Sequence, residues 1–312
     1  MGDSTKHAET STAPRAVAIV GAGALGTLLA SRLSSAGVNA RVLVRRQERT
    51  ATLRRDAPGA LAVDDSASLF PASLLFLCVK SYQTESAIAT LAEALAPASG
   101  RDSTPIVSLQ NGWGHMDRLE RAFGGTPLVA GTTTLGAFWD VGGRFHESPG
   151  GLTTFAPWTA SAGPACDDAV SLFGNAGLRA ERSVNARDTL WRKLVLNVAV
   201  NPVTAVHAVR NGALLEVPAL HAVAVAAARE AVAVGAARCH IAAPYDPEPL
   251  LDTLLRDTAE NRSSMAEDVA HGRPTEADAI VGATLREGAA AGVPTPVIAA
   301  LAERLRAATQ PR

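Results

Sequence analysis

Short apolar runs alternate with amphipathic segments over the first half of the chain. The apolar runs are rich in Val, Ile and Leu, which is typical of strands covered on both faces. They fall at residues 15–20, 39–44, 73–79, 105–110 and 127–134. Helical patterns occupy intervals between them, such as 84–96 and 115–123. Strands that alternate with helices predict a parallel, doubly wound α/β sheet.

The pattern changes after this sheet. Gly, Phe and Trp in "GAFWDVGGRFHESPGGLTTF" favour an antiparallel extension of the sheet from about residue 138. From about residue 185, long Ala/Val/Leu helical patterns dominate and are separated by Pro or Gly. They cover 188–200, 218–239, 247–270, 275–291 and 295–309. We therefore predict a disordered polar tail (1–14), an α/β domain (15–184) and an all-α domain (185–312).

Composition excludes some classes of binding partner but does not indicate a particular function. The 29 Lys and Arg residues balance 30 Asp and Glu, and aromatic residues make up 4%. Neither nucleic acid nor an anionic membrane is therefore expected as a partner. The tail lacks the apolar core of a signal peptide, and the apolar segment 222–237 is short enough to be a core helix. Cys78, Cys166 and Cys239 lack metal-ligand spacing, which favours reduced thiols in a cytoplasmic protein without a metal site.

A glycine-rich turn follows the first predicted strand. In "GAGALG" (21–26), Gly21, Gly23 and Gly26 stand between that strand and a helix, as in Rossmann domains that bind dinucleotides. Gly21 permits the tight turn, Gly23 lets the backbone approach a pyrophosphate, and Gly26 allows close helix–sheet contact. The phosphates would meet free N–H groups at the helix start. A glycine-rich turn without a ligand is the alternative interpretation.

The end of the second predicted strand indicates which dinucleotide is bound. NAD sites usually place an acidic residue there to hold the ribose 2′-hydroxyl. This chain has Arg45 and Arg46 instead, in "LVRRQ". Two guanidinium groups suit a 2′-phosphate better than a hydroxyl, so we predict NADP(H). A solvated surface pair is the alternative.

Polar residues also follow three later strands. Lys80 ends one, Asn111 ends the next, and Thr132–Thr134 end the third. Ligands of such sheets bind beyond the carboxyl ends of the strands, so these side chains are expected to line the site. Any one of them alone would be an ordinary loop residue.

Three polar residues interrupt an apolar helical pattern in "TLWRKLVLNVAVNP" (189–202). Lys193, Asn197 and Asn201 recur every four residues and so share one helix face. Pro202 predicts that the helix kinks or ends at Asn201. A polar stripe of this kind suits a polar small molecule in a cleft between domains. A salt-bridged lysine with two capping asparagines is the alternative.

A second polar cluster lies in "AENRSSMAEDVAHGRPTEAD" (259–278). Asn261 and Ser264 are three residues apart, which predicts a shared helix face. Thr275 and Asp278 match a capping-box pattern after Pro274. Glu276 would then lie in the first helical turn, where a surface carboxylate complements the helix dipole.

These motifs together resemble the ketopantoate reductase (2-dehydropantoate 2-reductase) family. The match covers essentially the whole chain after the tail, in the order "GAGALG", "VKSYQ", "QNGWG", "GTTT", "LWRKLVLNVAVNPVTA", "AENRSSM" and "RPTE". The "WRKL…N…NP" and "EN.SSM" segments are specific to that family, whereas GxGxxG is widespread. Gln110 is a mild departure from the family pattern, and Trp113 is bulky enough to alter the pocket.

The resemblance implies a Rossmann domain and a helical domain with NADPH and substrate between them. It implies that Lys193 is the general acid and that Glu276 is catalytic, binding the cofactor or organising the site. The implied substrate contacts are Asn111, Lys193, Asn197, Asn201, Asn211 and Ser264. The implied cofactor contacts are Gly21, Ala22, Gly23, Ala24, Leu25, Gly26, Arg45, Lys80, Asn111, Ala137 and Glu276.

The expected activity is therefore NADPH-dependent reduction of ketopantoate to (R)-pantoate, for pantothenate and coenzyme A. A paralogue that reduces another 2-oxo acid or ketone is a second hypothesis. A non-catalytic NADP(H)-binding sensor is a third, although a sensor has no need of the acid. The alanine-rich helices fit either close packing within one chain or a homodimer, and the sequence leaves both open.

Overall fold

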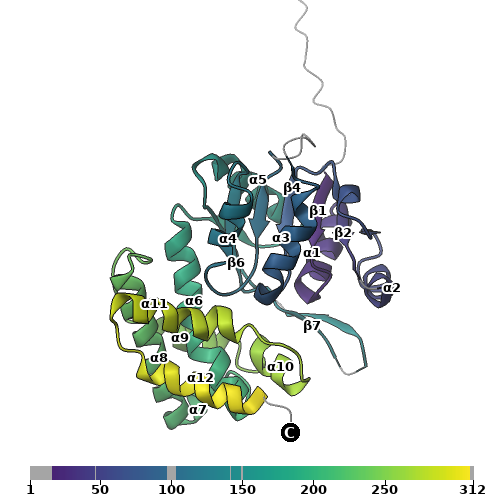
Figure 1. The fold of residues 1–312 in the computed structure, drawn as a ribbon. Helices are drawn as coiled ribbons and strands as arrows, with labels where there is room; N and C mark the ends of the chain where they lie inside the picture. The colour runs from purple at the N-terminus through teal and green to yellow at the C-terminus, as the bar shows by residue number, and fades with distance from the viewer. Residues whose placement is uncertain (1–15, 46, 97–102, 141, 149, 310–312) are drawn as a thin grey trace, which may run out of the picture.

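The computed structural model describes residues 16–45, 47–96, 103–140, 142–148 and 150–309. The predicted tail (1–14) and Arg46 lie outside the described residues. Two lobes lie against each other in Figure 1. One holds the sheet with its flanking helices, and the other holds the helices that follow the last strand.

An eight-stranded sheet forms the first lobe in the described part of the chain, in the order β10-β9-β6-β5-β4-β1-β2-β3. The strands are β1 (Ala16–Val20), β2 (Asn39–Leu43), β3 (Leu61–Val63), β4 (Leu74–Leu77), β5 (Ile106–Ser108), β6 (Leu128–Thr133), β9 (Thr153–Pro157) and β10 (Ala180–Arg182). The first six strands are parallel and follow the dinucleotide-binding order 3-2-1-4-5-6. The order reverses between β1 and β4, so ligand space is expected beyond the ends of those strands. The predicted α/β class is confirmed.

Helices cover both faces of this sheet. Alternate residues of β1 point to opposite faces, and both sets are buried, which explains why the strand is apolar throughout. On one face lie α1 (Ala24–Ser35), α2 (Gln47–Asp56) and α5 (Gly163–Asn175). On the other face lie α3 (Thr84–Ala92) and α4 (His115–Ala122).

The second lobe is helical and is built around α6 (Ala186–His207). The other helices are α7 (Ala213–Glu216), α8 (Pro218–Ala237), α9 (Glu248–Asp257), α10 (Ser264–Ala270), α11 (Ala283–Ala291) and α12 (Pro296–Thr309). In length and composition α8 would suffice for a membrane span, but it packs along α6 and buries Ala227, Ala228 and Ala231. One apolar cluster runs without a break from the sheet face under α3 and α4 into this lobe. The two lobes therefore share a core.

Pro202 predicted that the helix kinks or ends at Asn201, and an end there is wrong. Helix α6 continues through Pro202 to His207. Proline inside a helix costs about 3 kcal/mol because it removes one hydrogen bond and crowds the preceding turn. Residues 197–205 are all buried against neighbouring helices, and this packing holds the segment helical. Tertiary contacts outweigh the local preference here.

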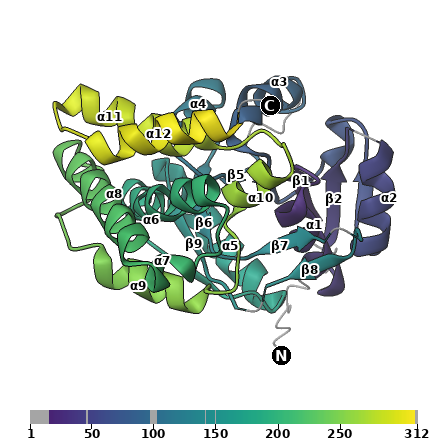
Figure 2. The same cartoon turned by 90° about the horizontal axis from the view of Figure 1, so that it is seen from below.

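The predicted antiparallel extension of the sheet is only partly right. Strand β9 joins the main sheet antiparallel to β6. The preceding residues instead form a separate hairpin of β7 (Ala137–Trp139) and β8 (Phe145–Glu147). Figure 2 shows this hairpin reaching toward α1 and α2. Trp139 Nε1 donates to Asp56 Oδ2 at 2.7 Å, and Arg32 pairs with Glu147, so side chains hold the hairpin away from the sheet edge.

Two long helical patterns in the second half are each divided. The pattern at 247–270 contains α9 and α10, separated by a loop whose carbonyl groups accept hydrogen bonds from the backbone of Asn211 and Gly212. Asn261 lies in that loop, so the predicted shared helix face with Ser264 is wrong. The pattern at 275–291 begins as a π-helical turn, Asp278–Gly282, before α11. Thr275 Oγ1 accepts a hydrogen bond from Ala277 N, whereas Asp278 pairs with Arg286, so no capping box forms.

Two helical glycines predict opposite responses to the same substitution. A Cβ on Gly235 of α8 would overlap the indole of Trp191, which is itself held by a 2.9 Å hydrogen bond from Nε1 to Ala231 O. A Cβ on Gly174 of α5 would meet nothing. We expect Gly235→Ala to lower the free energy of unfolding by about 1–3 kcal/mol. We expect Gly174→Ala to raise it by about 0.4–1 kcal/mol. Urea denaturation measures both, and an unchanged midpoint for Gly235→Ala would contradict this packing.

Candidate active site

The glycine turn between β1 and α1 has one open position and two crowded ones. Gly21 has φ +117°, and a Cβ there would lie 2.7 Å from the carbonyl carbon of Cys78. A Cβ on Gly26 would overlap the carbonyl oxygen of Gly21. Gly23 is exposed, has an ordinary backbone conformation (φ −82°), and would place a Cβ in open space. Neither strain nor packing requires glycine at position 23, so the missing side chain leaves room for a ligand.

The start of α1 fits an anionic group. No side chain caps its N-terminus, and its first turn contains no acidic residue. Ala22, Ala24 and Leu25 are partly buried around this turn. The N–H groups of the first turn lack intrahelical partners and carry the positive end of the helix dipole, which suits a phosphate. The residues present therefore fit a dinucleotide pyrophosphate.

Arg45 and Ala137 are two further residues expected to contact the cofactor. Arg45 follows β2, is exposed, and donates from Nη1 to Ser86 Oγ of α3 at 2.6 Å. Ala137 begins β7 and packs with the core under α1. No carboxylate follows β2 directly in the described residues, since Val44 and Arg45 occupy that place.

Glu276 is buried at the seam between the lobes, with 4% of its surface exposed. Its Oε1 accepts a hydrogen bond from Ser81 N at 3.0 Å, and its Oε2 accepts one from Asn111 Nδ2 at 3.1 Å. Lys80 Nζ lies 3.6 Å from Oε2. The expectation of a surface acid at this position is therefore wrong. A carboxylate from the helical lobe joins the ends of β4 and β5.

Asp268 is a second buried carboxylate at this seam, and sequence analysis did not select it. Its Oδ2 accepts a hydrogen bond from Lys80 Nζ at 2.8 Å, and its Oδ1 accepts one from Arg273 Nε at 3.0 Å. Burial alone would lower the pKa of Lys80, but the charges of Glu276 and Asp268 outweigh it and raise that pKa. Lys80 is therefore a firmly charged ammonium bound to two acids. Asp268 follows Glu267 in α10, and nothing in the local pattern distinguishes the buried acid from its neighbour.

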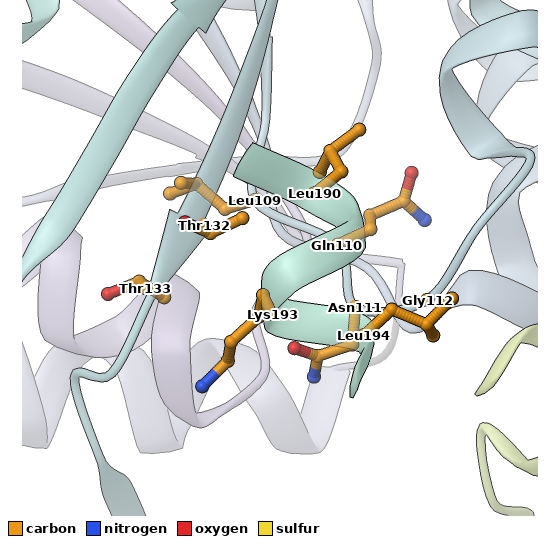
Figure 3. Close-up of a pocket in the computed structure, with 9 residues that line it drawn as sticks. All are labelled: Leu109, Gln110, Asn111, Gly112, Thr132, Thr133, Leu190, Lys193 and Leu194. Atoms are coloured by element: carbon orange, nitrogen blue, oxygen red, sulfur yellow. The ribbon is translucent and has the colours of Figure 1, made fainter. Parts of the chain in front are cut away.

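Lys193 stands in a pocket where the sheet meets α6 (Figure 3). The lining residues are Leu109, Gln110, Asn111, Gly112, Thr132, Thr133, Leu190, Lys193 and Leu194. Leu190, Lys193 and Leu194 share one face of α6. Figure 3 shows the polar ends of Lys193 and Asn111 on the same side, while the Gln110 amide points away. Gln110 instead bonds Thr84 Oγ1 at 2.8 Å.

The ammonium of Lys193 has no hydrogen-bond or ion-pair partner among the residues that the structure describes. The alternative of a salt-bridged lysine is therefore wrong. Burial lowers the pKa of Lys193 to about 8, because charge is disfavoured away from water. Near neutral pH such a group is still mostly protonated, yet it is a far stronger acid than an exposed lysine.

The asparagine side chains along α6 are buried but not fully satisfied. Asn197 and Asn201 are 9% and 7% exposed, and Asn197 Nδ2 has no partner. Neither residue caps the helix, because Asn185 is the N-cap of α6. An unsatisfied buried amide costs about 1–3 kcal/mol, and a polar ligand in the pocket would remove that cost.

Asn211 and Ser264 are not part of the pocket around Lys193. Asn211 is buried and donates from Nδ2 to Thr258 Oγ1 at 3.0 Å, while its Oδ1 has no partner. Ser264 is exposed. The preceding Ser263 is buried, caps α10 and bonds Thr204 Oγ1 at 2.7 Å. Their roles toward a substrate remain predictions from the family resemblance.

Comparison with known proteins agrees with this arrangement. Residues 17–160 match the family model for ketopantoate reductase PanE/ApbA, and residues 185–309 match the model for its C-terminal region. The 2-dehydropantoate 2-reductase of Vibrio cholerae is 33% identical, covering 94% of this chain and 98% of its own. A ketopantoate reductase family structure from Ralstonia eutropha superposes with a TM-score of 0.81 at 27% identity, covering 94% and 98% of the two chains. D-mandelate dehydrogenase with NADH and anilino(oxo)acetate shares the fold, with a TM-score of 0.82 at 21% identity, covering 94% and 98%.

The strand order, the glycine turn and a polar pocket at the strand ends are the features of a Rossmann-fold protein of the dinucleotide-binding type. The family matches then make the assignment narrower. The chain belongs to the ketopantoate reductase family.

The unsatisfied amide of Asn197 predicts a trade-off between stability and ligand binding. We expect Asn197→Leu to keep or raise the melting temperature, because it removes a buried group without a partner. Asn185→Ala is the matched control, because Asn185 Oδ1 accepts a hydrogen bond from Asp188 N at 3.1 Å. That change should lower the free energy of unfolding by about 1 kcal/mol. Calorimetry compares the two, and a strong loss of stability in Asn197→Leu would mean that its amide is satisfied.

Proposed function

We propose that this protein reduces the 2-oxo group of ketopantoate with NADPH, and that Lys193 is the general acid. The observation that carries the proposal is the Lys193 ammonium, which lies beside Asn111 at the ends of the strands and has no counter-ion among the described residues. Its burial lowers its pKa to about 8. The Vibrio cholerae relative is named for reduction of 2-dehydropantoate. The product would be (R)-pantoate for pantothenate and coenzyme A, made in the cytoplasm.

The proposed reaction needs a proton at the substrate oxygen. The glycine turn would hold the pyrophosphate of NADPH, which would supply hydride to the 2-oxo carbon, so negative charge would grow on the substrate oxygen. Lys193 stabilises that charge and donates its proton to it. The lowered pKa of Lys193 makes this donation easier than from an ordinary lysine. Asn197 and Asn201 offer neutral amide donors for the substrate carboxylate and hydroxyl.

Glu276 and Lys80 have a positioning role in this proposal. Glu276 bonds the Asn111 amide and the backbone N–H of Ser81. It therefore fixes the positions of the loops after β4 and β5, where cofactor and substrate would meet. Lys80 neutralises Glu276 and Asp268. Both acids are thereby engaged away from Lys193, which keeps its proton available for transfer.

NADPH rather than NADH is proposed because Arg45 follows β2 where a carboxylate would hold a 2′-hydroxyl. The guanidinium is exposed and reaches across to α3 through Ser86. A charged hydrogen bond to a 2′-phosphate is stronger than one to a hydroxyl. The fold alone does not decide this point, since D-mandelate dehydrogenase shares it and holds NADH.

Replacing the acid tests the assignment of Lys193. Lys193→Met keeps the side-chain length and removes the proton, so kcat should fall on the order of 100- to 10,000-fold. The dissociation constant for NADPH should change little. Arg192→Met is the control, because Arg192 pairs with Asp188 on another face of α6 and should keep kcat. Loss of NADPH absorbance after addition of ketopantoate, beside a panel of other 2-oxo acids, measures the rates and distinguishes the substrate. Full activity of Lys193→Met would remove this lysine from the mechanism.

The pH profile tests the same assignment without a mutation. Reduction needs protonated Lys193, so kcat/KM should be level below pH about 8 and fall about tenfold per unit above it. The kcat profile should break at higher pH, because the substrate carboxylate favours the charged lysine. The chain has three lysines, Lys6, Lys80 and Lys193. The titration of each lysine can therefore be followed directly through its ¹³Cε resonance. If none of these resonances titrates near pH 8, the assignment of the kcat/KM profile to Lys193 is wrong.

Replacing Arg45 tests the choice of cofactor. Arg45→Ala, alone and with Arg46→Ala, should raise the KM for NADPH on the order of 10-fold or more and leave that for NADH nearly unchanged. Arg54→Ala removes an exposed arginine of α2 and serves as the charge control. Equal losses with both cofactors would exclude a contact with the 2′-phosphate.

A further inference from the structure

Trp113 lies two residues after Asn111 but does not enter the pocket. Its indole is 7% exposed and belongs to the apolar core shared by the two lobes. The sequence raised the concern that this bulky residue alters the pocket, and the structure places it outside the lining. Any effect of Trp113 on the pocket must therefore be indirect, through the turn that carries Asn111.

The indole of Trp113 packs against two rings of the helical lobe that also contact each other. Its centroid lies 4.9 Å from Trp191 of α6 in an edge-to-face arrangement (84°) and 4.3 Å from the imidazole of His240. Trp191 and His240 are themselves 4.6 Å apart. Such aromatic pairs add about 0.5–1.5 kcal/mol each beyond the burial of their surface. We call these three residues the aromatic clasp.

The outer members of the clasp are fixed in turn. Trp191 Nε1 donates to Ala231 O of α8 at 2.9 Å. His240 Nε2 bonds Glu287 Oε2 of α11 at 3.0 Å, and Arg238 Nε donates to the same oxygen at 2.7 Å. Trp191 and His240, which contact Trp113, are therefore fixed by hydrogen bonds to α8 and α11 of the helical lobe.

The backbone of the same turn is also in close contact with the helical lobe. Trp113 N donates to Ala279 O at 2.9 Å. Gly112 has φ +90°, and a Cβ there would lie 2.6 Å from Ala279 Cβ. Ala279 lies in the π-helical turn that follows Glu276, which holds the Asn111 amide. Side chain and backbone thus fix one short turn against two elements of the helical lobe.

The two segments that meet in the clasp are the two that face each other across the pocket. Asn111 and Gly112 line it from the turn after β5, and Lys193 lines it from α6. Trp113 and Trp191 join the same turn and the same helix outside it. We propose that Trp113 is a positioning residue, whose indole sets the separation between Asn111 and Lys193 for the reaction. This proposal depends on the proposed function.

The separation matters because proton transfer tolerates little displacement. A shift of about 1 Å in a reacting group can cost on the order of 100-fold in rate. A looser turn would also admit water around Lys193, and its pKa would move up toward that of an exposed lysine. A residue that only stabilises the fold would change neither quantity once the protein is folded.

The test compares Trp113→Leu with Trp158→Leu. Trp158 is a half-buried tryptophan that packs on the same core and contacts the same Arg187 guanidinium, at 4.4 Å against 6.0 Å for Trp113. Its Nε1 donates to Glu120 within the sheet lobe, and it contacts α6 through the exposed Arg187 guanidinium and not through the rings of the aromatic clasp. Both variants should lose stability. Only Trp113→Leu should lower kcat, on the order of 10- to 100-fold, with the dissociation constant for NADPH nearly unchanged.

Trp113→Phe is the conservative rescue, because a smaller ring still reaches between the two partners and should recover most of kcat. The lysine ¹³Cε titration gives a readout besides activity. The resonance that is absent in Lys193→Met should titrate at higher pH in Trp113→Leu and at its original pH in Trp158→Leu. Equal kcat and equal titration in the two folded Leu variants would overturn the positioning role. If Trp113→Leu does not fold, Trp113→Met replaces it because its flexible side chain fills irregular space better, and wild-type kcat with an unshifted lysine titration in that variant would do the same. Absence of turnover in the wild type would refute the proposed function instead.

Discussion

The arrangement of the seam depends on how two lysines and two carboxylates are paired. The ammonium of Lys80 contacts both Glu276 and Asp268, and Arg273 bonds the other oxygen of Asp268. Lys193 on the facing helix has no counter-ion among the described residues. The same protein environment therefore moves the two pKa values apart, upward for Lys80 because of its acids and downward for Lys193 because of burial. Separation of this kind is what gives two identical side chains different chemical roles.

This pairing is sustained by apolar packing around it. Unsatisfied amides at Asn197 and Asn211 and an unpaired ammonium at Lys193 all lower the stability of the free protein. The apolar core that continues from the sheet into the helices supplies the opposing free energy. Proline in the middle of α6 is tolerated for the same reason, because the segment is packed on every side. The polar stripe can be poorly satisfied because its supporting helix is so well buried.

The parts of this structure that were predictable from sequence are those governed by local pattern. Strands covered on both faces appear in the sequence as apolar runs. The spacing of Gly21, Gly23 and Gly26 predicts a tight turn between a strand and a helix. Asn111, Thr132 and Thr133 line one pocket. This was predictable, because the carboxyl ends of parallel strands lie at the same edge of a sheet. The burial of Glu276 was not predictable, because its partners Ser81 and Asn111 lie 195 and 165 residues away. The same is true of the hairpin β7–β8, whose position depends on Asp56 and Arg32 of distant helices. The domain division at 184/185 and the roles given to the site residues stay predictions.

The shared core also limits how the pocket can be made accessible. Moving the lobes apart as rigid bodies would expose the apolar surface between α6 and the sheet, at about 25 cal/mol per Å². It would also break the aromatic clasp and the buried bonds of Glu276. The groups that border the pocket differ greatly in how firmly they are held. Asn111 is bound by Glu276 and followed by the aromatic clasp, whereas the Lys193 ammonium has no bond to any of the described residues. The side of the pocket that carries Asn111 is held firmly and fixes the geometry. On the side that carries Lys193, a ligand can gain binding free energy without first displacing a protein contact.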